Sequence, residues 1–254
     1  RVAGRALQGT VETTLVPMGA GLHPARHAVN CALIAARIVA GMGQSEEAPA
    51  TALLALVHGA GLAEAGVDFD APQRVVDEEV LDPEGRRLRP AAILKALGIE
   101  DPDLPARVVD VQALLASAPP APAERGRADL RVQAVALAAI LHRTWHDGHA
   151  RGIDLPDVTS AVMAAHGQRF GALLFRGLLR AIPIFPVGCQ VELSSGDLAR
   201  VVAQNDDNHF RPRVEITTSP GRSGAERRVV DLSRAPFLHI RHRIGAGGVQ
   251  EAGR

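Results

Sequence analysis

The chain is poor in cysteine and has no long apolar run. Its 254 residues include only two cysteines, Cys31 and Cys189, which lie in segments of different character and follow no CxxC spacing. We therefore expect two buried free thiols in a reducing compartment, and the cytoplasm is the simplest location. Cys31 lies mid-helix among apolar neighbours and is expected to contribute to core packing. No apolar run approaches the ~20 residues that cross a bilayer, and residues 1–10 lack the apolar segment of a secretory signal, so no membrane association is expected.

The sequence also lacks a basic character and has no tyrosine. Its formal net charge is +0, and Lys95 is its only lysine. Without an excess of positive charge, nucleic-acid binding is not expected. What the chain has is 46% hydrophobic residues, over a length that can bury a large core in one or two soluble globular domains.

The spacing of apolar residues predicts that the chain divides near Pro186. Before it, Ala and Leu dominate and apolar residues recur at helical spacing. The stretch 116–123 contains three prolines and is expected to be a surface loop. The expected helices cover residues 24–42, 47–58, 90–97, 103–116, 129–146, 155–165 and 170–181.

After Pro186 the pattern changes to short alternating runs separated by turn-rich segments such as 194–197 and 205–208. The fold class predicted is therefore mainly α, with a helical domain over residues 1–185 and a small antiparallel β module over residues 186–254. The expected strands cover residues 189–193, 198–204, 213–218, 227–232 and 238–244.

The residues of the helical part that best indicate a chemical function are histidines, which are candidate metal ligands. The apolar stretch 52–62 predicts a buried helix that ends at His58, with Gly59 directly after it. His142 and His146 lie four residues apart, so they share one helical face at the spacing of metal ligands. The same pair is also typical of a polar helix end near the C-terminal dipole, and no Glu-x-x-His pattern accompanies it.

The order of these segments resembles the HD-GYP domains, which are bacterial phosphodiesterases that act on cyclic di-GMP. The resemblance covers nearly the whole chain. It implies an HD-domain helical bundle followed by the β extension found after many HD-GYP domains. The similar segments are 26–32, 43–47, 52–62 and 89–99, and the most specific is 185–196 with 211–214 and 230–232.

Most catalytic positions of that family are occupied here by other residue types. In family members, histidines and aspartates hold two or three iron-like or manganese-like ions that activate a water for attack on phosphorus. The resemblance places His27 and His58 at two ligand positions, but Gly59 stands where an aspartate would bind. The family's lysine falls on or near Leu62, and the histidine of its His-Pro segment falls on Arg89. Its paired histidines fall near Val111 and Gln112, and its late aspartate falls near Ala139. Its Gly-Tyr-Pro loop falls near Pro119 and Pro120.

A bridged metal pair needs anionic oxygen ligands to offset its charge, and two neutral imidazoles supply none. We therefore expect no catalytic site, no metal and no other cofactor, with His27 and His58 as vestigial ligands that form hydrogen bonds in the helical core. The expected function is regulatory, through protein partners such as diguanylate cyclases or other cyclic di-GMP signalling domains. We also expect that this chain can form a homodimer through a helical face.

Two alternatives stay open. The first is a metal-dependent phosphohydrolase with a rebuilt site that uses His58 together with His142 and His146. The second is a sensor that binds cyclic di-GMP without cleaving it, through arginines that grip phosphate with two hydrogen bonds. The candidate arginines are Arg86, Arg87, Arg89, Arg227 and Arg228.

Overall fold

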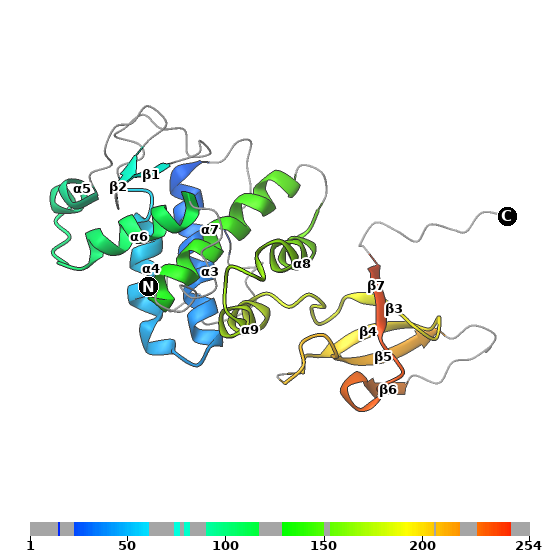
Figure 1. The fold of residues 1–254 in the computed structure, drawn as a ribbon. Helices are drawn as coiled ribbons and strands as arrows, with labels where there is room; N and C mark the ends of the chain where they lie inside the picture. The colour runs from blue at the N-terminus through cyan, green and yellow to red at the C-terminus, as the bar shows by residue number, and fades with distance from the viewer. Residues whose placement is uncertain are drawn as a thin grey trace. The chain divides into compact units, whose positions relative to one another are not determined.

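The computed structural model describes residue 15 and residues 23–60, 74–76, 79–81, 90–116, 129–149, 153–205, 207–218 and 228–244. They group into two compact units, Arg1–Ile182 and Pro183–Arg254, which we describe separately. The first unit is helical and the second is an antiparallel sheet (Figure 1), so the predicted fold class is confirmed. Most of the predicted loop at 116–123 lies outside the described residues.

The helices of the first unit begin and end within three residues of their predicted bounds. The described elements of this unit that were not predicted are the short helix η1 and an antiparallel pair, β1 (Arg74–Val76) with β2 (Glu79–Leu81). None of the described helices is long and apolar enough to cross a membrane. The helices are α3 (Pro24–Gly41), η1 (Ser45–Glu47), α4 (Ala48–Val57), α5 (Pro90–Ala96), α6 (Leu104–Ala116), α7 (Leu130–His149), α8 (Leu155–His166) and α9 (Ala172–Ala181).

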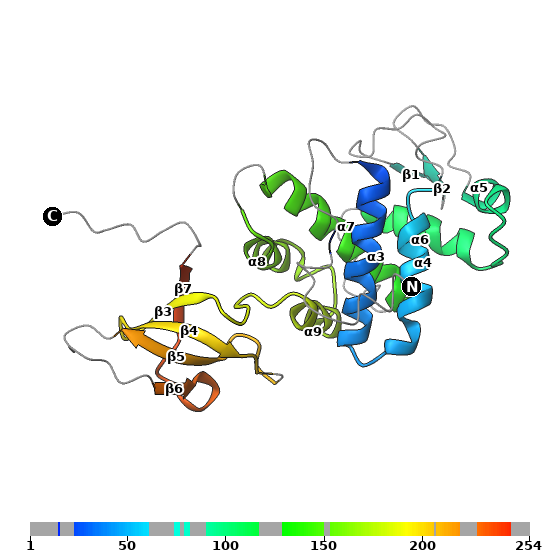
Figure 2. The same ribbon diagram turned by 180° about the vertical axis from the view of Figure 1, so that it is seen from behind.

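Helix α3 lies at the centre of the first unit, in contact with α4, α7 and α9 (Figures 1 and 2). A helix with neighbours on several sides must be apolar around most of its circumference. Its residues from Cys31 to Val39 meet this requirement, because all of them except Arg37 are buried. Four of these positions are filled by small residues, which allow neighbouring backbones to approach closely: Cys31, Ala32, Ala35 and Ala36. Gly41 adds a further small residue at the end of the helix.

The closest approach between helices is at the crossing of α3 and α9. A Cβ added to Gly177 on α9 would overlap the carbonyl oxygen of Ile38 on α3. A Cβ added to Gly41 would lie 2.7 Å from the carbonyl oxygen of Gly177. Because both obstacles are backbone atoms, neither can move aside without a shift of a whole helix.

We expect Gly177→Ala to lower the free energy of unfolding by about 1–3 kcal/mol, because the added methyl group forces the two helices apart. Chemical denaturation measures this change. The matched control is Gly171→Ala at the start of the same helix, where an added Cβ meets nothing within 4 Å. That variant should lose less than about 1 kcal/mol, the cost of a poorer N-cap residue. Equal losses in the two variants would contradict the close crossing.

The second unit is a five-stranded antiparallel sheet in the order β6-β5-β4-β3-β7. The first four strands form a meander, and the last returns to pair with β3. The strands, each close to its predicted bounds, are β3 (Gln190–Leu193), β4 (Leu198–Ala203), β5 (Arg213–Thr218), β6 (Arg228–Asp231) and, after η2 (Leu232–Arg234), β7 (Ile240–Ile244).

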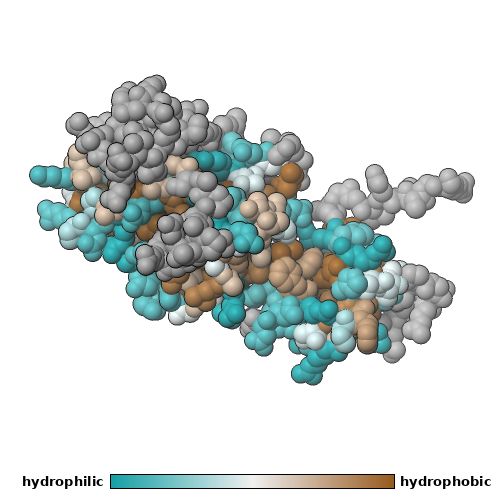
Figure 3. Space-filling view, viewed as in Figure 1, coloured by the Kyte–Doolittle hydropathy of each residue, from teal (hydrophilic) through white to brown (hydrophobic). Residues whose placement is uncertain are grey.

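Alternation along the strands builds the core of this module, since every second side chain faces the same side. The buried residues from β3 to β5 are Val191, Leu193, Ala199, Val201, Val214 and Ile216. Gly196 has a φ of 83° in the predicted turn between β3 and β4, a conformation that favours glycine. Outside the core, hydrophobic and hydrophilic residues are interspersed on the described surface seen in Figure 3.

Candidate functional site

Three histidines from three helices meet in the core of the helical unit. His27 lies in the first turn of α3, which begins at Pro24, a residue favoured at the first helical position. His58 is the C-cap of α4, and His142 lies on α7. Because α3 packs against both α4 and α7, the three rings are brought together, and all three residues are buried.

A directed series of hydrogen bonds joins two of these rings to their neighbours. The amide Nδ2 of Asn30 lies 2.9 Å from His142 Nε2, and His142 Nδ1 lies 2.9 Å from His27 Nδ1. An amide nitrogen only donates, so His142 Nε2 accepts and the proton of a neutral His142 is on Nδ1. That proton is donated to His27 Nδ1, which places the proton of His27 on Nε2. His27 Nε2 in turn lies 3.4 Å from the Sγ of Cys31.

The same burial keeps these groups uncharged at neutral pH. Desolvation, reinforced by the nearby His58 and His142, lowers the pKa of His27 from 6.5 to about 2. Burial, with His146 and His58 close by, lowers the pKa of His142 to about 4. Burial also raises the pKa of the Cys31 thiol well above its usual range. Neutral imidazoles are the form in which histidine binds metal.

His58 is oriented from both sides. Its Nδ1 lies 2.6 Å from the carbonyl oxygen of Ala55, so Nδ1–H donates and the lone pair of the ring is on Nε2. Burial lowers the pKa of His58, and the bond to Ala55 opposes this effect in part. The side-chain amide of Gln112 on α6 donates to the carbonyls of His58 and Ala60, at 2.8 and 3.0 Å. These bonds fix the turn that carries His58.

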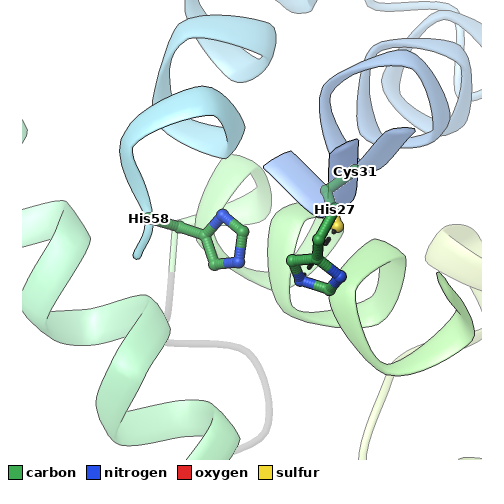
Figure 4. Close-up of side chains that lie close together, drawn as sticks. All are labelled: His27, Cys31 and His58. Atoms are coloured by element: carbon green, nitrogen blue, oxygen red, sulfur yellow. Dashed lines mark hydrogen bonds between the residues drawn. The ribbon is translucent and has the colours of Figure 1, made fainter. Parts of the chain in front are cut away.

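The residues best placed to share a metal ion are His27, Cys31 and His58. One ligand atom from each lies within 4.8 Å of the others. Figure 4 shows His58 at the end of α4 facing His27 on α3, with Cys31 beside His27. Within the described part of the chain, no aspartate or glutamate joins this group.

The two histidines of the predicted α7 pair have different surroundings. His142 is fully buried and contacts His27. His146 is partly exposed, and its Nδ1 lies 3.5 Å from the carboxylate of Asp147. The close group of ligand atoms found among the described residues includes neither of them. His142 instead contacts this group through its hydrogen bond to His27. We call the four residues His27, Cys31, His58 and His142 the cluster.

Cys31 is the member of the cluster that sequence reasoning assigned only to core packing. Its burial was predicted and is confirmed, since its exposed fraction is 0%. The missed signal is its spacing, because Cys31 follows His27 by four residues and so lies on the same face of α3.

The other positions of interest have no ligand role in the described structure or lie outside it. Ala139 and Val111 are buried apolar residues. Arg228 is exposed at the start of β6. Positions that fall outside the described residues are Leu62, Arg86, Arg87, Arg89, Pro119, Pro120 and Arg227.

Comparisons with known proteins find one partial relative. The chain is 36% identical over 74 residues to a cyclic di-GMP phosphodiesterase of Pseudomonas aeruginosa. The match covers 29% of this chain and 18% of the relative's length. No family model matches the chain, and no solved structure matches it. The partial match supports an HD-GYP-like relationship and nothing narrower.

The donors of the cluster do not fit the bridged ions that an HD-GYP relationship implies. Two or three cations held a few ångströms apart need carboxylates, which bridge ions and offset their charge. The described cluster offers imidazole nitrogens and one sulfur, and the residue after His58 is Gly59. Its donor set suits a single soft cation.

The buried histidines predict a stability that depends on pH in the metal-free protein. Histidine binds protons near pH 6.5 when unfolded, whereas the folded pKa values are about 2 for His27 and about 4 for His142. The unfolded state therefore binds more protons between these limits. The contribution of each histidine is complete above pH 6.5 and is lost as the pH falls toward its folded pKa.

Urea denaturation of the chelator-treated protein measures this effect. Below pH 6, we expect the free energy of unfolding to decrease by about 1.4 kcal/mol for each unit by which the pH falls and for each such histidine. His142→Asn removes one of these groups, so its slope between pH 6 and pH 5 should be shallower by about that amount. A slope that does not differ between the two proteins would show that His142 is not held neutral.

Proposed function

We propose that this chain is a catalytically inactive HD-GYP-like protein with a regulatory role in cyclic di-GMP-related signalling. The observation that carries the proposal is the donor set of the cluster. His27 and His58 stand at the positions of metal-binding histidines in the HD-GYP resemblance, but no carboxylate accompanies them among the described residues. Water held between two cations cannot be activated where one of the cations has no ligands.

The hydrogen bonds of the cluster support the same proposal. The Nδ1 atoms of His27, His58 and His142 all lie within hydrogen-bonding distance of a protein acceptor or donor. The histidines are thus retained as buried polar groups with hydrogen-bond partners, His27 with His142 and His58 with the backbone of Ala55, which a folded core requires whether or not a substrate is bound. The connection to cyclic di-GMP rests on the relative from Pseudomonas aeruginosa, which is a cyclic di-GMP phosphodiesterase.

The first test measures hydrolysis. The purified chain is incubated with cyclic di-GMP and either ferrous iron or manganese, beside the variant His58→Ala. We expect both proteins to yield linear dinucleotide only at the rate of the metal-containing buffer. Hydrolysis by the wild type that exceeds that of His58→Ala would overturn the inactive assignment and favour the rebuilt hydrolase.

The second test addresses the regulatory role. We infer that diguanylate cyclase domains are the partners, because a protein that cannot cleave the nucleotide can still alter its level through the enzyme that makes it. The purified chain is added in turn to each diguanylate cyclase of its source organism, and the rate of cyclic di-GMP synthesis is followed. A change of at least about twofold with one of them, corresponding to about 0.4 kcal/mol, is expected. Unchanged rates with all of them would contradict this role.

A further inference from the structure

The thiol of Cys31 adds a donor that the HD-GYP resemblance does not include. Its Sγ lies 3.4 Å from His27 Nε2, and a ring nitrogen of His58 lies within 4.8 Å of this sulfur and of one ring nitrogen of His27. All three side chains are buried, with exposed fractions of 0% for His27 and Cys31 and 2% for His58. Two imidazoles and a thiol in one buried cluster are the donors that zinc and similar cations prefer.

The spacing of the donors suits a single tetrahedral ion. Such an ion binds imidazole nitrogen at about 2.0–2.1 Å and thiolate sulfur at about 2.3 Å, so neighbouring ligand atoms lie roughly 3.3–3.8 Å apart. The pair His27 and Cys31 already has this separation, at 3.4 Å. His58 has to move inward by at most about 1.5 Å.

The surrounding residues hold the two imidazoles as ligands are usually held. A metal-binding histidine donates its other ring N–H to a carbonyl or a similar acceptor, which fixes the orientation of the ring. His58 does so through Nδ1 and the carbonyl of Ala55, whereas His27 accepts at Nδ1 from His142 in this structure and would donate there once its proton has moved from Nε2 to Nδ1.

We propose that His27, Cys31 and His58 form a site for one divalent cation of the zinc class, bound by two imidazole nitrogens and one thiolate. The ion would fasten the first turn of α3 to the end of α4. This site is independent of the proposed signalling function, because it requires neither cyclic di-GMP nor a partner protein.

Binding releases one proton. The thiol of Cys31 loses its proton to solvent and becomes the thiolate ligand. The proton of His27 leaves Nε2, which binds the ion, and the ring is protonated on Nδ1 instead. His142 then accepts at Nδ1 and donates from Nε2, and the Asn30 amide turns so that its oxygen accepts. Both histidines are neutral before and after this exchange.

The test uses zinc alone as the probe. The full chain is treated with a chelator, dialysed and titrated with zinc against a coloured competitor. We expect one ion per chain, and Cys31→Ser should weaken binding more than about 100-fold, since even residues behind the ligands commonly contribute 10–100-fold. The matched control is Cys189→Ser, which removes the other free cysteine, located in the β module. It should bind as the wild type does.

A second readout needs no variant that must fold. Cobalt added to the chelator-treated wild type should give the intense near-ultraviolet absorption of a cobalt–thiolate bond, with visible bands of tetrahedral geometry. Absence of that absorption would overturn the proposal. Zinc binding that is equally tight in Cys31→Ser and Cys189→Ser would overturn it as well, because the thiolate would then not be a ligand.

Discussion

The helical core depends on one constraint: three imidazoles and a thiol are buried together, and none of the described aspartates or glutamates joins their group of ligand atoms. A buried ionised group is costly unless it is paired, so each of these groups remains neutral and bonds to its neighbours. The order Asn30, His142, His27, Cys31 follows from that requirement, since each ring nitrogen must either donate or accept. Neutrality is also what separates this cluster from a hydrolytic metal centre, where carboxylates offset the charge of paired ions.

The helix packing brings these groups together. Small residues along α3 and the glycines at its crossing with α9 allow the helices to lie close, and the same helix presents His27 to both α4 and α7. The α6 helix contributes from a third direction, because Gln112 holds the turn that carries His58. Scaffold and cluster are therefore parts of one core, and a change that separates α3 from its neighbours also separates the donors.

The sequence predicts the elements well and the cluster only in part. Apolar periodicity located all seven described α-helices, because an amphipathic or buried helix shows its period directly. Turn residues such as Gly196 located the hairpins of the β module. The strands β1 and β2 were missed, since three residues are too few to show an alternation. The resemblance predicted that His27 and His58 lie in the helical core and form hydrogen bonds there.

The spacing of residues along the sequence did not predict which side chains contact each other. His142 was grouped with His146 by its spacing along α7, but a helical face says nothing about which ring lies opposite. The structure places His142 against His27, and it places Cys31, assigned only to packing, beside the same ring. Which donor meets which depends on how α3, α4 and α7 pack in three dimensions, and periodicity along one helix does not contain that information.

We propose that this cluster does not hold the paired ions of a phosphodiesterase, because no carboxylate joins it among the described residues. Anomalous diffraction from crystals grown with excess manganese and, separately, with ferrous iron tests it most directly. We expect at most one anomalous peak per chain beside His27 and His58. Two peaks about 3.5–4 Å apart, bridged by solvent as in two-metal hydrolases, would contradict it.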